Sequence, residues 1–401
     1  MNDYRRMKKA LLLGLVLCAG AASPGLAETF PDCLAGLRGQ ALSAGVSAAT
    51  FDGQTSGLAA DMTVLDAMNK QPEFKTPIWD YIAALVDDER VAQGKQMLSK
   101  YGGVLAGVQK RFGVDPAIVV AVWGVESNYG QTTGARPLVQ SLATLSCYAG
   151  RREGYFRGEF FNTLKIIQHG DVDPKHLMGS WAGAFGQTQF MPSTFLRSAV
   201  DGDGDGRRDI IDSVPDALAS TANFLAKAGW ASGSRWGFEV ALPASFNAGA
   251  AGRTRKRALS AWAAMGVTRV DGSALPKGDQ RAGILLPAGP TGPAFVVFKN
   301  FDTIYSYNAA ESYALAIAHL SDRIKGGAPF ATPWPTDDPG LSRAERRELQ
   351  TLLTKRGYDV GTPDGAIGAK TVAAIKDVES RLGWKQTGRP GQKVLVALRK
   401  G

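Results

Sequence analysis

Glu126 is the residue whose surroundings most favour acid–base chemistry. It lies in the segment Trp123–Gly130, at the end of an apolar run that follows Asp115 and Pro116. Asp115 is a typical helix cap, Pro116 suits the first helical position, and Gly130 favours a helix end. The negative end of the helix dipole and the apolar neighbours would both favour the protonated carboxyl group, as a general acid requires. The alternative is a solvated surface carboxylate, which is common in a last helical turn.

A second chemical signal is the acidic segment Asp201–Asp212, whose spacing resembles an EF-hand calcium loop. The expected oxygen ligands are the side chains of Asp201, Asp203 and Asp205 and the carbonyl of Arg207. Position 12 of the loop is Asp212 instead of the usual glutamate, so Asp216 is an alternative last ligand. Three carboxylates at alternate positions repel one another unless a cation lies between them. We therefore predict a structural Ca²⁺ site, with a solvated turn as the alternative.

The elements that must position these groups are mostly helical. Residues 28–325 indicate one helical body, in which Asp216–Ala228 and Ala309–Ile324 are further expected helices because apolar residues recur at helical spacing. Residues 235–300 contain short apolar runs bounded by Gly and Pro. Such runs favour strands, so we expect a small β subdomain inserted into the helical body.

The chain length of 401 residues suggests two or three domains. Four prolines within residues 326–340 predict a stiff, extended linker, and residues 341–401 then form a separate unit of three short helices. Hydrophobic residues make up 44% and charged residues 21%, which excludes a mainly disordered chain. The expected fold class is therefore mainly α, with a smaller β part.

The first 27 residues have the features of a cleaved secretory signal: basic residues, a short apolar run and small residues at the cleavage site. A lipid anchor at Cys18 is the less favoured alternative. Cleavage would remove four basic residues and Asp3, which lowers the net charge from +9 to +6. This charge is not clustered, so it suits an anionic wall or membrane surface and does not indicate nucleic acid. No later segment is apolar for long enough to span a membrane.

Two cysteines, Cys33 and Cys147, remain after the signal is removed. In an oxidising compartment they are a candidate disulfide pair, and two buried thiols are the alternative. The histidines His169, His176 and His319 lie in neither a catalytic-triad nor a metal-motif context, which argues against a serine or zinc hydrolase.

Four motifs in register resemble the lytic murein transglycosylase B family over about residues 30–325. The segment 126–130 (ESNYG) resembles the family's catalytic Glu-Ser motif, and 179–193 resembles its Gly-Gln-Phe-Met-Pro signature. The segment 151–156 and the pair Tyr307-Asn308 complete the pattern. The resemblance implies a lysozyme-like helical catalytic domain that cleaves peptidoglycan glycan strands in the periplasm, without a cofactor for catalysis.

The resemblance also implies roles for individual residues. Glu126 would protonate the leaving glycosidic oxygen and then, as a base, accept a proton from the muramic C6 hydroxyl after the substrate's acetamido group has attacked. Apart from Glu153 in the segment 151–156, the matched motifs contain no second carboxylate, which most glycosidases need. The expected substrate-binding residues are Arg151, Arg152, Ser180, Gln189, Tyr307, Asn308, Tyr313 and Tyr129. Each of these also has a structural alternative, such as a helix cap for Ser180 or a core position for Tyr313.

The C-terminal unit, residues 341–401, resembles a three-helix peptidoglycan-binding domain. Its matching features are Leu349-Gln350, Gly357–Asp359, Asp364-Gly365, Gly368 and Thr371. Such a module would raise the local concentration of the enzyme at the wall. Other cell-wall enzymes are further candidate partners. The rival functions are a muramidase that completes the reaction with water and a non-catalytic wall-binding protein.

Overall fold

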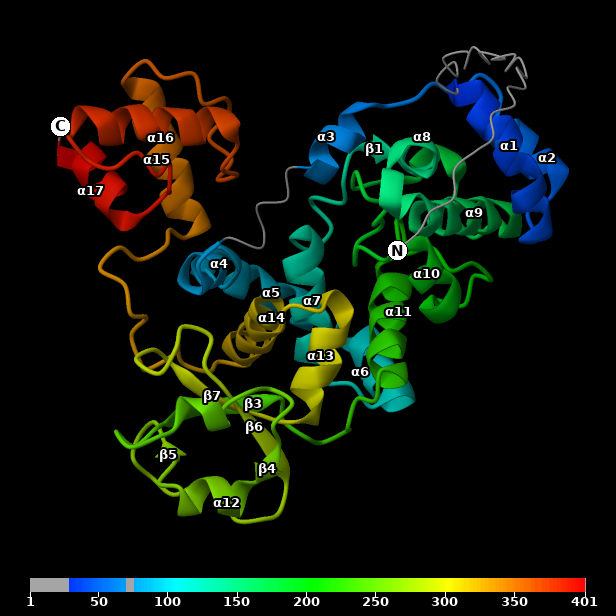
Figure 1. Cartoon of the computed structure of the whole chain (residues 1–401). Coiled ribbons are helices and arrows are strands. Elements are labelled where there is room, and N and C mark those ends of the chain that lie inside the picture. Colours follow the sequence, from blue (N-terminus) through cyan, green and yellow to red (C-terminus); the bar gives the residue numbers. More distant parts are fainter. Residues whose placement is uncertain (1–28, 70–75, 401) are drawn as a thin grey trace, which may run out of the picture.

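The computed structural model describes residues 29–69 and 76–400 (Figure 1). The expected signal segment and Cys18 lie outside the described residues. Within the described ranges, no helix combines the length and the apolar character that crossing a membrane requires.

The first of two helical lobes packs around buried aromatic and aliphatic side chains such as Phe156, Phe160 and Leu142. Its helices are α1 (Phe30–Ser43), α2 (Ala48–Thr55), α3 (Thr63–Asn69), α8 (Leu138–Tyr148), α9 (Glu153–His169) and α10 (Pro192–Ser198). Short turns and strands join them: β1 (Arg136–Pro137), η2 (Gly150–Arg152), η3 (Pro174–His176) and β2 (Met178–Gly179). A disulfide joins Cys33 of α1 to Cys147 of α8 across 114 positions of sequence, with 6.0 Å between the Cα atoms.

The second helical lobe surrounds α7 (Pro116–Ser127), which is almost entirely buried. Its other helices are α4 (Ile78–Leu85), α5 (Asp88–Lys100), α6 (Gly102–Phe112), α11 (Val214–Lys227), α13 (Lys299–Asn308) and α14 (Glu311–Ile324). Apart from Glu126 and Ser127 at its end, α7 is apolar on every face, which allows α5, α6, α11 and α14 all to pack against it. The sequence prediction of a helix capped by Asp115 agrees with this element, since the Asp115 side chain accepts a hydrogen bond from the backbone N–H of Ala117.

The predicted helix Ala309–Ile324 differs from the structure at its start. Ala309 has a left-handed backbone, with φ of 47°, and it separates α13 from α14. The helix α13 was not predicted, because its first residues follow directly on the apolar β run. The turn at Ala309 lets the two helices fold back on each other, and they pack in extensive contact.

The inserted β subdomain is a five-stranded antiparallel sheet with the order β4-β6-β7-β3-β5. Its elements are β3 (Gly237–Ala241), η4 (Ala248–Ala250), β4 (Arg257–Ala258), α12 (Leu259–Ala264), β5 (Thr268–Arg269), β6 (Arg281–Leu285) and β7 (Ala294–Val297). The buried Trp262 of α12 anchors this small core, and its indole N–H donates to the carbonyl of Ala282 in β6.

The predicted linker, residues 326–340, has no helix, but it is attached to the body. The ring of Phe330 stacks on His319 of α14, with 3.7 Å between the ring centroids. The backbone N–H groups of Ala331 and Thr332 donate to the carboxylate of Glu239 in β3, at 2.7 and 2.8 Å. The linker therefore follows the surface of the body instead of crossing open solvent.

The C-terminal module consists of α15 (Arg343–Lys355), α16 (Ala369–Arg381) and α17 (Gln392–Lys400) around its own small core. A capping box between Ser342 and Glu345 starts α15. The module lies next to α4 (Figure 1), where Arg389 forms an ion pair with Asp80.

Candidate active site

The end of α7 places Glu126 at a sharp turn of the chain. The helix stops at Asn128, which has φ of 51°, and Tyr129 and Gly130 continue in left-handed conformations. Gly124 is required one turn earlier, because a Cβ atom there would lie 2.7 Å from the ring of Tyr129. This local geometry leaves Glu126 half-buried at the edge of the lobe.

The environment of Glu126 suits a proton donor. The hydroxyl of the buried Tyr313 donates a hydrogen bond to Oε1 of Glu126. Burial raises the pKa of Glu126 from 4.5 to about 7, and the hydrogen bond from Tyr313 opposes part of this rise. A carboxyl group with such a pKa exists in both protonation states at neutral pH, so it can give up a proton and accept one back.

Glu126 opens into a cavity of about 860 Å³. One wall comes from the helical body, including Leu85, Val125, Asn308 and Tyr313, and the other wall comes from the C-terminal module. The module contributes Arg346, Ile367, Val372, Thr387, Gly388, Arg389 and Pro390. No sequence motif indicated that the module reaches this site.

Asp80 is the other carboxylate that lines this cavity among the described residues. Both of its oxygens accept hydrogen bonds from the Arg389 guanidinium, at 2.5 and 2.7 Å. Because this ion pair already occupies both oxygens, Asp80 is not a free carboxylate beside Glu126. The cavity therefore offers one carboxyl group for proton transfer.

The Gly-Gln-Phe segment is fastened to the end of α7 by Ser127, a residue that the sequence analysis did not select. The buried hydroxyl of Ser127 donates to the carbonyl of Gln187 at 2.5 Å and accepts from the N–H of Gly130 at 2.9 Å. The Tyr307 hydroxyl donates to the carbonyl of Thr188 at 2.7 Å. These bonds fix the Glu126 turn, the signature segment and α13 relative to one another.

Three of the predicted substrate-binding residues lie next to Glu126. Tyr313 is its hydrogen-bond partner, and the rings of Tyr307 and Tyr313 stack at a centroid distance of 6.2 Å. Asn308, the last residue of α13, is exposed and lines the cavity. The buried ring of Tyr313 offers its hydroxyl instead of a sugar-stacking face.

Ser180 and Gln189 do not line the Glu126 cavity. The Ser180 hydroxyl accepts a hydrogen bond from the N–H of Ala184 at 3.0 Å and closes a turn in the signature segment. The Gln189 side-chain amide donates to the carbonyls of Thr133 and Gly186, at 3.0 and 2.8 Å. In this structure both side chains shape the signature segment.

Tyr129 corrects a prediction, because its ring lies in the core. It is 8% exposed, packs edge-on against Trp123, and its hydroxyl donates to the carbonyl of Arg90 at 2.7 Å. Arg152 lies at the start of α9 with its guanidinium over the rings of Tyr155 and Phe156, and it does not line the cavity. The side chain of Arg151 lies outside the described part of the chain.

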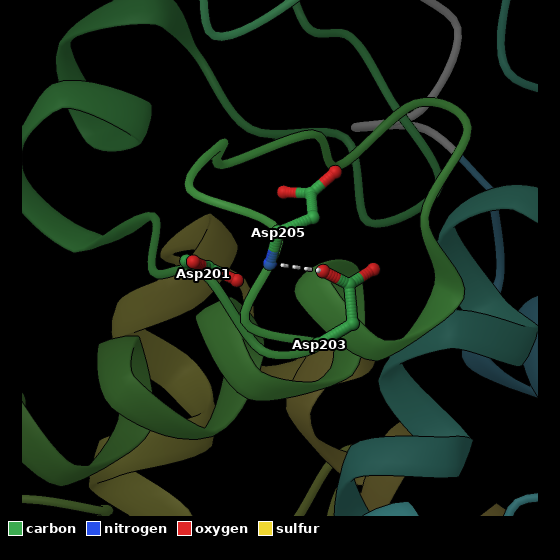
Figure 2. Close-up of side chains that lie close together, drawn as sticks. All are labelled: Asp201, Asp203 and Asp205. Atoms are coloured by element: carbon green, nitrogen blue, oxygen red, sulfur yellow. Dashed lines mark hydrogen bonds between the residues drawn. The ribbon is translucent and has the colours of Figure 1, made fainter.

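The acidic loop brings three of its predicted ligands together (Figure 2). Oxygen atoms of Asp201, Asp203 and Asp205 all lie within 4.8 Å of one another. Asp201 also accepts from the N–H groups of Gly204 and Gly206, at 2.6 and 2.9 Å, and this lowers its pKa. The loop is exposed, and hard carboxylate oxygens are the donors that Ca²⁺ prefers.

Asp212 and Asp216 are not part of this group of clustered carboxylate oxygens, so their part as the last ligand stays a prediction. The Asp212 carboxylate is hydrogen-bonded to Nδ1 of His176, at 2.8 Å. Asp216 is buried and accepts from the N–H groups of Gly202 and Asp209, at 2.8 and 2.6 Å. The Asp216 side chain thus holds the backbone of the loop in place. The guanidinium of Arg207 pairs with Asp209.

Comparisons with known proteins agree with this arrangement. Residues 29–322 match the family described as transglycosylase SLT domain, and residues 342–398 match a peptidoglycan binding domain. The chain is 34% identical over 260 residues to membrane-bound lytic murein transglycosylase B of Escherichia coli strain K12, covering 64% of this chain and 70% of that protein.

Two solved structures are similar over most of the chain. SltB3 of Pseudomonas aeruginosa, solved with NAG-anhNAM-pentapeptide, is 46% identical with a TM-score of 0.75 and covers 93% of this chain and 100% of its own. The Escherichia coli lytic transglycosylase Slt35, solved with calcium, is 29% identical with a TM-score of 0.64 and covers 73% of this chain and 92% of its own. The chain therefore belongs to the transglycosylase SLT domain family and is a lytic murein transglycosylase of the B type with a C-terminal peptidoglycan-binding domain.

Proposed function

We propose that this enzyme cleaves the β-1,4 bond between N-acetylmuramic acid and N-acetylglucosamine with Glu126 as its single proton-transferring carboxyl group. The observation that carries the proposal is the half-buried Glu126, whose pKa is raised to about 7, in a cavity large enough for sugar rings. In its protonated form, Glu126 donates to the leaving glycosidic oxygen as the bond from that oxygen to the anomeric carbon breaks.

The second half of the reaction uses the same group as a base. Since Asp80 is held by Arg389, the nucleophile is proposed to be the acetamido oxygen of the substrate. The ionised Glu126 then takes the proton of the muramic C6 hydroxyl, and the C6 oxygen bonds to the anomeric carbon as the acetamido oxygen leaves. The product is a 1,6-anhydro ring, and no water is consumed. The hydroxyl of Tyr313 stabilises the carboxylate between the two proton transfers.

The test uses purified sacculi and measures the product mass of the wild-type enzyme and the cleavage rate of Glu126→Gln. Wild-type enzyme should release products one water lighter than hydrolysed muropeptides. The variant should lose at least about 10²–10⁴-fold in rate, the usual contribution of general acid–base catalysis, while still binding sacculi. Asp279→Asn, which removes an exposed carboxylate of the β subdomain, is the matched control and should leave the rate unchanged. Hydrated product ends would identify a muramidase, and a near wild-type rate for Glu126→Gln would refute the role of Glu126.

We also propose that Asp201, Asp203 and Asp205 bind a structural Ca²⁺ ion. Their clustered oxygens support it, as does the calcium bound by the similar Slt35. Calcium at a hundredfold excess over its Kd should stabilise the folded state by about 2.7 kcal/mol. The melting temperature should therefore rise with Ca²⁺ and fall with chelator, and Asp203→Asn with Asp205→Asn should abolish the response. A melting curve that chelator leaves unchanged would contradict the site.

We further propose that the mature enzyme works in the periplasm after cleavage of residues 1–27. The basic, apolar and small-residue pattern of that segment supports this location, and lipidation at Cys18 is the alternative. Mass spectrometry of the mature N-terminus distinguishes the two, since lipidation would leave Cys18 as the modified first residue. An unprocessed chain that begins at Met1 would contradict both.

A further inference from the structure

The C-terminal module places a cation in the cavity that contains Glu126. Arg346, near the start of α15, lines this cavity opposite the helical body and is half-buried. Its Nε–H donates to the carbonyl of Leu341 at 3.1 Å, which orients the guanidinium. This bond holds the Nε end of the guanidinium in place, and the other N–H groups of Arg346 remain for a further partner.

The charge of Arg346 is not neutralised by an ion pair within the described residues. Asp80 and Asp87 attract it, but only from beyond ion-pair distance. Asp80 is already bound by Arg389 through both oxygens. Asp87 caps α5 by accepting from the N–H of Arg90 at 2.8 Å, and its other oxygen lies 3.7 Å from Arg343. Each nearby carboxylate thus has another cation or donor as its closer partner.

The walls around Arg346 would strengthen its attraction for an anion. Ile367 and Val372 of the module and Leu85 of the body line the same cavity, and burial lowers the pKa of Arg346. A guanidinium in such surroundings binds a carboxylate more strongly than one in open water, and its planar fork suits two parallel hydrogen bonds. A carboxylate from outside the protein is the group that fits.

The position of Arg346 depends on how the module is held. The Arg389 guanidinium bridges Asp80 of α4 and Asp338 of the linker, and Arg347 of α15 pairs with Glu89 of α5. These contacts join the module to the two helices beside the cavity. Arg346 is the residue before Arg347 in α15 and lines the cavity, so docking of the module brings its side chain to the site.

We propose that Arg346 is a substrate-binding residue that holds a carboxylate of the peptidoglycan strand beside Glu126. The proposal rests on the proposed function, and it makes the C-terminal module part of the catalytic site as well as a wall-binding unit. The carboxylate has two chemical sources: the lactyl group of a muramic acid that lacks its peptide, and the acidic groups of a stem peptide.

The test compares full-length wild type, Arg346→Met and Arg346→Lys on three substrates. These are peptide-free glycan strands with free lactyl carboxylates, the same strands after conversion to methylamides, and strands that carry stem peptides. Arg399→Met is the matched control, because it removes an exposed cation of the same module that pairs with Glu348 away from the cavity. Melting curves check that every variant is folded.

The expected result for Arg346→Met is a KM increase of about tenfold on a carboxylate-bearing strand, as the loss of one charged hydrogen bond predicts. The methylamide strands should show less than about a twofold change by the same reasoning, since no charged bond is lost. Arg346→Lys should recover part of the KM, and kcat should stay close to wild type throughout. A change confined to free lactyl strands identifies that group as the ligand, and a change confined to peptide-bearing strands identifies the stem.

Two results would overturn the proposal: equal KM values for wild type and Arg346→Met on every substrate, or an equal change on the methylamide strands. Failure of the proposed function is separate from this outcome, because it would appear as hydrated product ends or as an active Glu126→Gln enzyme.

Discussion

Replacing Glu126 with glutamine is expected to stabilise the folded protein, but only above about pH 4.5. The folded pKa of about 7 exceeds the ordinary value of 4.5, so between these values the folded state binds more protons than the unfolded state. The free energy of unfolding of the wild type therefore falls as pH rises through this window. Glutamine carries no charge, and its carbonyl can still accept the Tyr313 hydroxyl.

The magnitude follows from the two pKa values. At about 1.4 kcal/mol for each pH unit, the interval from 4.5 to about 7 corresponds to at most about 3–4 kcal/mol. The stability gain of Glu126→Gln should be near zero at pH 4.5 and should approach this limit by pH 8. The energy represents the cost of holding a carboxylate in an apolar site, which the enzyme bears for its chemistry.

The assay is urea unfolding of both proteins at several pH values from 4.5 to 8. Taking the difference between the two curves removes every titration that they share. Asp279→Asn serves as the control for loss of a carboxylate, since that side chain is exposed. A stability difference for Glu126→Gln that does not change with pH would refute the reasoning that burial raises this pKa.

Three further predictions concern other groups. Tyr313→Phe removes the hydroxyl that favours ionised Glu126, so the alkaline limb of the pH–rate profile should move to higher pH by about one unit. A limb that does not move would contradict the effect of Tyr313 on the pKa of Glu126. Loss of the Cys33–Cys147 bridge in a double serine variant should cost about 4–5 kcal/mol in urea unfolding, and finding both thiols free by peptide mapping would exclude the bond. Burial lowers the pKa of His319 from 6.5 to about 3, so the unfolded state binds the proton more readily below pH 6.5. Between pH 6.5 and 5, wild type should therefore lose about 2 kcal/mol more stability than His319→Phe, and equal losses of unfolding free energy in the two proteins would disprove this.

Local sequence rules predicted the helix that carries Glu126, because a cap, a proline and apolar spacing all act within one segment. They did not predict its catalytic environment, since Tyr313 is 187 positions away along the chain. The same rules placed Tyr129 at the substrate. Its ring lies in the core because the backbone at Asn128 turns in a left-handed conformation, and the residue type of Tyr129 alone does not determine this direction.

The acidic loop shows the same division between local and distant information. The alternate spacing of Asp201, Asp203 and Asp205 is local, and the structure brings these three side chains together. Asp212 also contacts a group from another part of the chain, because its carboxylate is hydrogen-bonded to Nδ1 of His176. The docking of the module is more distant still, because Arg389 and Asp80 are 309 positions apart.

The attachment of the linker to the body changes how a wall-binding module can act. With a free tether, the module would search a volume set by the tether's length, and the two binding events would be linked only statistically. Here Phe330 rests on His319 and Glu239 holds the following backbone, so the spacing between the module and Glu126 is set when the chain folds. The entropy of aligning two binding surfaces is then lost once, during folding, and not at each encounter with the wall. A glycan strand can bind to both surfaces at once only if its disaccharide repeat matches that spacing. The attached linker would therefore select strands by the distance between their repeating units.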